Sequence, residues 1–273
     1  MEQLILASGE CDLTQQTVCA PADVTELFEY RIPVFEILGF PITRTVFLMF
    51  LAAAIVAAIT FFGLRRKAVV PGRFQAAVEA LFGFVRDEVA IGIIGPHGIR
   101  YYPYLLAIFL FVLVGNFFEI TPFVNFPITS RMALPASLAA LTWVIFIAAG
   151  IKRQGVRYVA DILWPPGVPV FLRPLVGAIE FVSTFLVRPF SLAVRLFANL
   201  VAGHVMLTLL LTTGLVSLTT IGEIGALKGA FGIAWWALGL AIFLFEVVVI
   251  VLQAYIFTLL SAVYIETSVN PAH

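Results

Sequence analysis

The sequence predicts an all-α, polytopic membrane protein, and three observations support this. Of its 273 residues, 62% are hydrophobic and only 12% are charged, whereas soluble domains carry about 25% charged residues. The mean hydropathy is +1.06. Several apolar runs are long enough to cross a bilayer core of about 30 Å. We expect five membrane-crossing helices, one amphipathic surface helix, and a hairpin formed by the last two crossings.

Residues 1–44 are expected to form an extracytoplasmic segment before a single membrane domain over 45–273. The segment contains Pro, Asp and Glu and lacks the basic start, apolar core and small-residue site of a cleavable signal peptide. Its cysteines, Cys11 and Cys19, are either two free thiols or a disulfide, which requires an oxidising compartment.

Three apolar runs of ordinary length predict the first three crossings. They cover residues 46–64, 104–121 and 134–151. The first stops at Arg65-Arg66-Lys67 and the third at Lys152-Arg153. Residues 72–92 mix charged and aliphatic side chains, which is typical of a helix lying on the membrane surface. A loop is expected over 152–174.

Two later apolar segments, 175–214 and 233–265, are much longer. No proline occurs between Pro189 and Pro271, so nothing forces a break. At about 1.5 Å per residue these helices would measure roughly 60 Å and roughly 50 Å, while the bilayer core measures about 30 Å. We therefore expect two long, tilted helices in an antiparallel hairpin, with its turn at Gly222–Gly225.

The distribution of Lys and Arg predicts the orientation, because cytoplasmic loops are enriched in both. Five crossings place ten of these residues on one side and four on the other. The ten are Arg65, Arg66, Lys67, Arg73, Arg86, Arg100, Lys152, Arg153, Arg157 and Arg173; the four are Arg31, Arg44, Arg131 and Lys228. The N-terminus is expected outside and the C-terminus in the cytoplasm.

Arg195 lies in the middle of the fourth crossing. A guanidinium cannot lose its charge in a protein, and placing it at bilayer depth costs about 2.5–3.5 kcal/mol on insertion scales. Such a residue favours an ion or proton path with a carboxylate partner. The alternative is a structural ion pair inside the helix bundle, but no acidic residue lies one turn away on the same helix.

Polar residues on the two long helices fit one hairpin register. In an antiparallel hairpin, facing residues have a nearly constant sum of residue numbers. Arg195 with Gln253 and His204 with Glu246 meet this condition, and the midpoint falls in the Gly222–Gly225 turn. Asn199 lies on the same helical stripe as Arg195. The His204–Glu246 pair either exchanges protons or only holds the hairpin together; the spacing of other Cys, His and Asp residues does not favour a metal site.

Three further polar residues each have two interpretations. Asn116 and Glu119 either cap the end of a crossing or line an access path. Glu180 is either a surface charge or a carboxylate on a path to the cytoplasmic side.

The segment Arg195-Leu-Phe-Ala-Asn-Leu-Val-Ala-Gly-His204, followed by Glu246 and Leu252-Gln-Ala-Tyr-Ile-Phe257, resembles the family of F-type (bacterial-like) ATP synthase subunit a. Asn116-Phe-Phe-Glu119 and Arg188-Pro-Phe-Ser191 are similar to two further segments of that family. The resemblance covers residues from about 30 to 268. The first 30 residues match no family that we can name.

The resemblance implies a proton-translocating stator subunit with two half-channels beside the rotating ring of c subunits. Arg195 is similar to the family's essential arginine, Asn199 to its asparagine and Gln253 to its glutamine. Some members carry the acid on the fifth helix and the histidine on the sixth, the reverse of His204 and Glu246. Because these positions face each other, the exchange keeps one imidazole and one carboxylate in place.

The implied partners are the c ring, the b subunits of the peripheral stalk, membrane lipid and H⁺, with Na⁺ as the alternative ion. The implied location is the cell inner or plasma membrane, with multiple crossings. No catalytic role, cofactor, metal or nucleic-acid partner is expected, and the chain has no Gly-rich phosphate loop, so ATP chemistry would reside on other subunits.

Two other classes fit less well. A secondary ion-coupled transporter or channel would favour internal repeats or broken helices at mid-membrane, and the sequence shows neither. A purely structural assembly subunit would have no need for a centred arginine.

Overall fold

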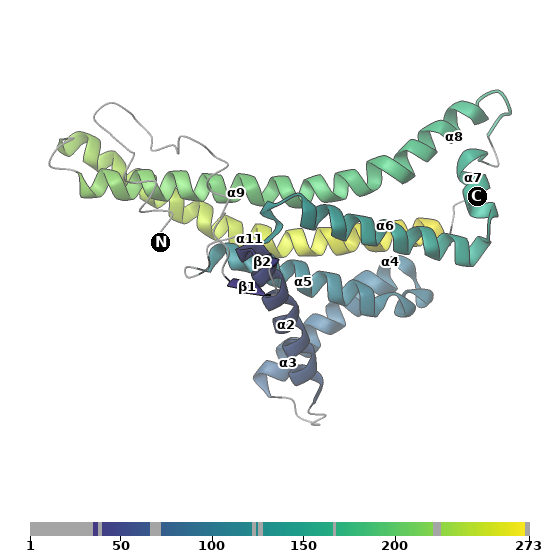
Figure 1. Cartoon of the computed structure of the whole chain (residues 1–273), viewed down its shortest axis with the longest axis horizontal. Coiled ribbons are helices and arrows are strands. Elements are labelled where there is room, and N and C mark those ends of the chain that lie inside the picture. The colour runs from purple at the N-terminus through teal and green to yellow at the C-terminus, as the bar shows by residue number, and fades with distance from the viewer. Residues whose placement is uncertain are drawn as a thin grey trace. The chain divides into compact units, whose positions relative to one another are not determined.

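The computed structural model describes residues 35–37, 40–65, 72–121, 124, 128–165, 168–220 and 225–270. Among these, five helices are long and apolar enough to cross a membrane, and nearly all the rest is helical too (Figure 1). The predicted all-α class with five crossings is therefore confirmed, and the chain is an integral membrane protein. Cys11, Cys19 and most of the predicted N-terminal segment lie outside the described residues.

A short β-hairpin precedes the first crossing and was not expected. Strand β1 (Phe35–Ile37) pairs antiparallel with β2 (Phe40–Ile42), with Phe35 opposite Ile42. Both strands consist largely of aromatic and β-branched residues, which favour extended backbone. The exception to the all-α prediction is thus confined to a few residues outside the membrane helices.

The first three crossings have bounds close to the predicted ones. They are α2 (Arg44–Arg65), α5 (Tyr102–Ile120) and α6 (Ala133–Gln154). Helix α6 ends at Gly155, whose φ of 68° suits glycine and whose N–H donates to the Ile151 carbonyl at 2.7 Å. Lys152 and Arg153 occupy its last turn, where positive charge interacts favourably with the negative end of the helix dipole.

The predicted surface helix is a chain of short helical pieces between α2 and α5. These are α3 (Arg73–Phe84), the π-helix η2 (Val85–Ile91), α4 (Gly92–Ile94) and the 3₁₀-helix η3 (Pro96–Arg100). Val78, Phe82, Val85 and Val89 are buried on one face, as the amphipathic pattern predicts. The π-helical turn was not foreseen.

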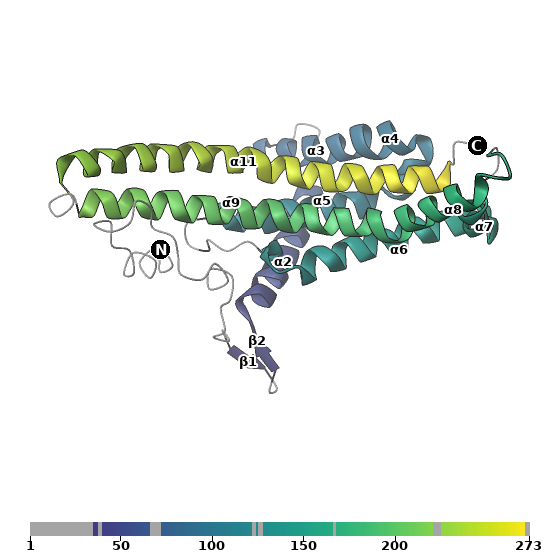
Figure 2. The ribbon, with the colours of Figure 1, turned by 90° about the horizontal axis from the view of Figure 1, so that it is seen from above.

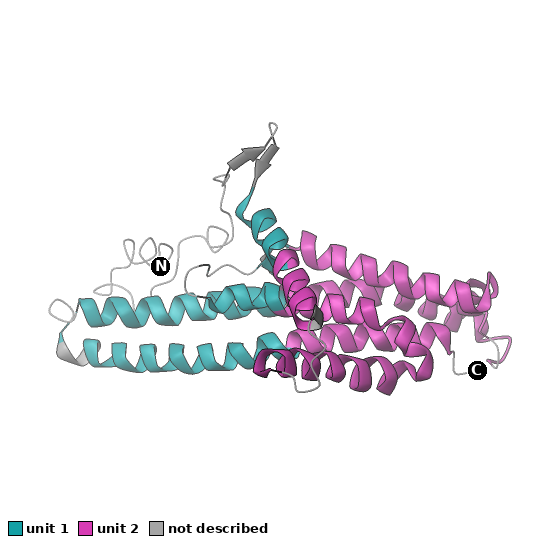
Figure 3. Cartoon of the chain, turned by 90° about the horizontal axis from the view of Figure 1, so that it is seen from below, with its two compact units in different colours: residues 1–52, 114–131, 198–252 teal, residues 53–113, 132–197, 253–273 magenta. Residues whose placement is uncertain are grey.

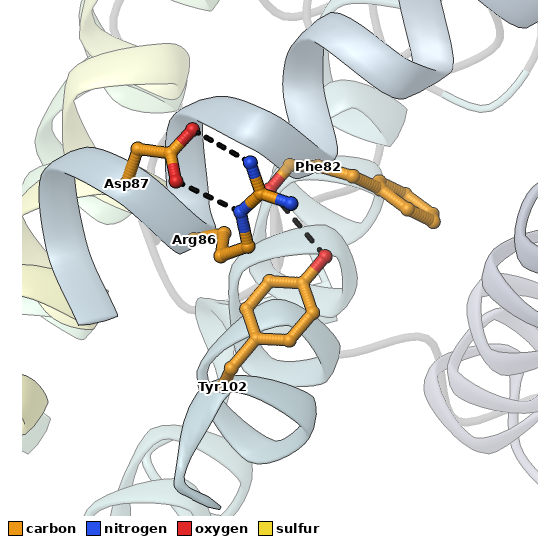
Figure 4. A network of polar contacts seen from close by, with 4 residues as sticks. All are labelled: Phe82, Arg86, Asp87 and Tyr102. Carbon is orange, nitrogen blue, oxygen red and sulfur yellow. Dashed lines mark hydrogen bonds and ion pairs between the residues drawn. The ribbon is translucent and has the colours of Figure 1, made fainter. Parts of the chain in front are cut away.

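An exposed ion pair lies on the outer face of η2 (Figure 4). Arg86 Nε donates to Asp87 Oδ1 at 2.8 Å, and nearby the Tyr102 hydroxyl donates to the Phe82 carbonyl at 3.4 Å. The hydrogen bond from Arg86 holds the pKa of the Asp87 carboxyl below its usual value.

A helix also occupies part of the segment predicted as a loop. Helix α7 (Arg157–Leu163) buries Tyr158 and Ile162. Arg157 and Asp161, one turn apart, approach to 3.8 Å. The loop prediction was wrong here because two buried apolar residues at helical spacing are too weak a pattern to read from the sequence.

The two longest helical segments are the fourth and fifth crossings. The fourth comprises α8 (Arg173–Val182), the π-helix η5 (Ser183–Val187) and α9 (Arg188–Thr219), and the fifth is α11 (Ala226–Val269). The chain divides into two compact units, coloured in Figure 3. Unit 1 contains residues 1–52, 114–131 and 198–252; unit 2 contains 53–113, 132–197 and 253–273.

Within unit 1, α9 and α11 form the expected antiparallel hairpin (Figure 2). Three glycines fix its register because each meets the facing helix too closely for a side chain. A Cβ would lie 2.7 Å from Trp236 N at Gly214, 2.6 Å from Ser217 Cβ at Gly232 and 2.7 Å from Leu211 Cδ2 at Gly239. These pairs have nearly the same number sum as His204 with Glu246, so the register predicted for this part is confirmed.

Candidate functional site

Unit 1 buries four of the residues that the sequence singled out. Asn116 is 0% exposed, Glu119 1%, His204 1% and Glu246 5%. Asn116 and Glu119 come from the last turns of α5, His204 from α9 and Glu246 from α11. We call these four, with the buried Thr129 of the 3₁₀-helix η4 (Ile128–Ser130), the outer polar cluster.

Contacts inside the outer polar cluster link the three helices. The carboxyl groups of Glu119 and Glu246 lie close enough to interact electrostatically. Glu246 also packs against Gly203, where a Cβ would collide with its carboxylate, so the side chain lies beside the residue that precedes His204. Small residues on α9 therefore make room for a carboxylate on α11.

Several polar atoms of the outer polar cluster have no hydrogen-bond partner among the described residues. These are Asn116 Nδ2 and both carboxyl oxygens of Glu119. Thr129 Oγ1 donates to Asn116 Oδ1 at 3.3 Å and meets only part of this demand. Leaving such groups unpaired is costly away from water. The arrangement suits groups that accept and release protons or bind ordered water.

Buried hydroxyl groups continue along α9 beyond His204. Thr208, Thr212, Thr213 and Ser217 are all buried, and His204, Thr208 and Thr212 recur at four-residue steps on one face. These residues and Thr129 were not predicted as site residues, although the four-residue spacing from His204 could have revealed Thr208 and Thr212.

Unit 2 contains a cavity of about 290 Å³ around Glu180. Ser183, Thr184 and Arg188 line it from the same helical segment, and Asp161, Gln154 and Thr267 from others. Glu180 is half-buried. We call this the inner cavity. Glu180 therefore borders a cavity lined by both apolar and polar side chains, where a path residue could lie.

Two features of the fourth crossing build the inner cavity. The π-helical turn η5 adds a residue to the helix and brings both Ser183 and Thr184 into the cavity wall. Arg188 Nη1 donates to Thr267 Oγ1 at 3.4 Å and its guanidinium lies 5.4 Å from the Tyr264 ring centroid. Such π-turns occur frequently at functional sites, but the hydrophobic pattern gave no sign of this one.

Arg195 lies on α9 within unit 2, and its side chain is exposed at the surface of the described chain. It forms no hydrogen bond or ion pair with any described residue. On α9 itself, Ala198 and Ala202 are also exposed and follow Arg195 at three- and four-residue steps. The structural ion-pair interpretation of Arg195 thus finds no partner in the described part of the chain.

Gln253 and Asn199 differ in burial. Gln253 of unit 2 is 5% exposed and its Nε2 has no partner among the described residues, whereas Asn199 of unit 1 is half-buried. Arg195 and Gln253, which the predicted register places opposite each other, form no hydrogen bond in the described part of the chain. The amide therefore stays available to another group.

Comparison with known proteins identifies the family. The family model described as ATP synthase A chain matches residues 46–266, which is most of the chain and includes every site residue predicted from the sequence. The chain is also similar to many curated proteins. Three examples show the extent of the similarity.

The ATP synthase subunit a of Frankia alni is 44% identical over 216 residues, which cover 78% of this chain and 73% of that protein. The subunit a of Gluconobacter oxydans is 42% identical over 221 residues, covering 81% and 86%. The subunit a of a Nocardioides species is 38% identical over 233 residues, covering 85% and 83%.

Proposed function

Because this chain belongs to the ATP synthase A chain family, we propose that it is the stator subunit that conducts protons to and from the ring of c subunits. It binds no nucleotide itself and couples proton flow to ring rotation, while other subunits make ATP. Its partners are the c ring, the b subunits of the peripheral stalk and membrane lipid. The N-terminus lies outside the cytoplasmic membrane and the C-terminus inside, as the Lys and Arg distribution predicts.

The observation that carries this proposal is Arg195, an exposed guanidinium in the middle of a membrane helix with no partner in the described chain. A charge in that position needs a counter-charge, and each c subunit supplies a membrane carboxyl group in turn. A carboxyl group facing lipid keeps its proton because desolvation disfavours the ion. Beside Arg195 the ionised form is favoured, so the proton is released.

Arginine suits this role better than lysine. A desolvated lysine can lose its proton, whereas the guanidinium keeps its charge. Arg195 therefore also forms a fixed positive barrier between two half-channels and blocks direct proton leakage. Ala198 and Ala202, exposed on α9, allow a facing helix to approach closely.

The outer half-channel runs through the outer polar cluster. Histidine titrates near neutral pH in water. His204 is buried in the same cluster as the carboxyl groups of Glu119 and Glu246. Asn116 and Thr129 orient this set by their hydrogen bond. Protons enter by this route and reach the ring on one side of Arg195.

The inner half-channel begins in the inner cavity. Its polar lining of Glu180, Ser183 and Thr184 suits a chain of water molecules between the ring and the cytoplasm. Arg188 is held by Thr267 and Tyr264 and is thus a fixed positive group in the cavity wall. Asn199 and Gln253 form no direct hydrogen bond with Arg195 in the described chain. They help to position Arg195 when the c ring is bound.

The test is ATP-driven proton uptake in inverted membrane vesicles carrying Arg195→Ala. Arg73→Ala, which removes an exposed charge from the surface helix, is the matched control. Normal assembly with uptake abolished in Arg195→Ala and retained in Arg73→Ala supports the proposal. Uptake that survives in a fully assembled Arg195→Ala complex would refute it.

A further inference from the structure

A second cavity of unit 2, with a volume of about 410 Å³, is lined by basic side chains. They are His97 and Arg100 from η3 and Lys152 and Arg153 from the last turn of α6. We call it the cationic cavity. It lies where α5 begins and where α6 and α11 end, and Pro96, Tyr101, Ala149 and Val269 complete its lining.

The charges of the cationic cavity are uncompensated within the described chain. Arg100, Lys152 and Arg153 are exposed, and the described salt bridges, Arg86–Asp87 and Arg157–Asp161, involve none of them. No acidic side chain lines the cavity. Basic groups gathered without a carboxylate favour an anionic ligand.

Backbone turns at two glycines hold the basic groups together. Gly95, with φ of 83°, starts η3 and so brings His97 and Arg100 before α5. Gly155 ends α6 directly after Arg153 and Gln154. The cluster is therefore built by the ends of folded helices and does not depend on a long loop.

The cavity is apolar on its other side. Ala149 and Val269 line it and are 5% and 6% exposed. Ile99 and Ile151, each beside a basic residue in sequence, are 57% and 42% exposed. A cationic rim next to apolar surface, at the ends of membrane-crossing helices, matches the level of lipid headgroups in a bilayer.

We propose that the cationic cavity binds the phosphate group of an anionic membrane lipid, whose acyl chains lie along Ile99 and Ile151. Ligand cavities commonly have volumes of about 300–1,000 Å³, so this one can hold a phosphoglycerol headgroup. An arginine guanidinium group can bind two oxygens of one phosphate group through two parallel hydrogen bonds. Basic pockets between membrane helices on the cytoplasmic side are suited to such headgroups, and the Lys and Arg distribution predicts that side here.

The test uses the purified whole complex and a phosphatidylglycerol probe with a photoreactive acyl chain, with the matching phosphatidylcholine probe as reference. Labelled peptides are mapped by mass spectrometry. Arg100→Gln and Lys152→Gln each remove one cavity charge, Arg100→Lys retains it, and Arg73→Gln removes an exposed charge elsewhere. A parallel arm adds excess inorganic phosphate as competitor.

We expect the phosphatidylglycerol probe to label peptides containing Ile99 and Ile151 well above the phosphatidylcholine probe. Labelling should fall about fivefold for each charge removed, remain largely intact in Arg100→Lys and be unchanged in Arg73→Gln. Should Lys152→Gln fail to assemble because it disturbs the α6 end, Arg100→Gln decides alone.

Resistance to inorganic phosphate identifies the lipid as the ligand. Displacement by inorganic phosphate, with phosphate binding lost in Arg100→Gln, would overturn the lipid proposal and assign the cavity to a free phosphate. Equal labelling by both probes, or labelling unaffected by Arg100→Gln, would also overturn it.

Discussion

The outer polar cluster and the inner cavity contain similar residue types but bury them differently. Glu119, His204 and Glu246 are at most 5% exposed and lie between packed helices, while Glu180 is half-buried and lines an open cavity of about 290 Å³. A buried set must pass each proton through particular side chains. A cavity that admits water offers many routes. The outer half-channel should therefore be much more sensitive to substitution than the inner one.

Glu246→Gln should have the largest effect. It keeps the shape of the side chain but removes the proton-exchanging group that α11 contributes to the buried cluster. Because the carboxyl group of Glu119 comes from α5 and occupies a different position, proton pumping should fall by about 10²-fold or more. ATP-driven uptake in inverted vesicles measures this. Glu266→Gln, in the last turn of α11 and outside both sites, should retain full uptake. A Glu246→Gln complex that pumps normally would contradict the greater sensitivity of the outer half-channel to substitution.

Exchange of the two outer residues should rescue function. His204→Glu and Glu246→His should each impair pumping, because each leaves positions 204 and 246 with two groups of one kind. The double variant restores one imidazole and one carboxylate and should pump within about fivefold of the parent, since contacting residues couple strongly. Uptake rates of all four proteins measure this. A double variant no better than the worse single variant would contradict the expected pairing.

Thiol labelling rates should show a smaller difference between the inner cavity and the buried residues of α9. In a background carrying Cys11→Ser and Cys19→Ser, a water-soluble maleimide added to inverted vesicles should modify Ser183→Cys at least about tenfold faster than Thr208→Cys, because reaction requires access to the thiolate. Ser183 lines the inner cavity and Thr208 is buried. Equal rates would show that the two regions are equally hydrated.

The Arg86–Asp87 pair should show the smallest effect, since both side chains are exposed and exposed ion pairs contribute little. The lowered pKa of Asp87 means that any stabilisation is present above its usual pKa of 3.8 and is lost as the pH falls below that value. Asp87→Asn should thus leave melting temperature and pumping unchanged at pH 7. A clear decrease in melting temperature or in pumping would show that the Arg86–Asp87 pair of η2 contributes to stability or to proton transport.

The sequence predicted most of the fold because membrane crossings leave long apolar runs and because the polar pairs on α9 and α11 constrain the register. Gly214, Gly232 and Gly239 confirm that register within unit 1. The polar pairs are informative because a charge or an amide is easily recognised among the apolar residues of a membrane helix. The small residues are informative because they allow a facing helix to approach closely.

The remaining features depend on backbone detail that hydrophobic patterns do not record. The π-helical turn η5 places Ser183 and Thr184 in the inner cavity, yet its apolar pattern differs little from that of an α-helix. Thr129 joins the outer polar cluster only because η4 returns the chain to Asn116. Arg195 and Gln253 likewise show that facing positions do not guarantee a hydrogen bond.

The role of Arg195 as a barrier is tested by the passive proton permeability of vesicles that contain the Arg195→Ala complex. An imposed membrane potential drives the flow, and the ring is prevented from turning. If Arg195 separates two half-channels, the variant should leak protons and the parent should not. The leak should disappear when Glu246→Gln is added, because the outer half-channel is then blocked. An assembled Arg195→Ala complex as tight as the parent would contradict the role of Arg195 as the barrier.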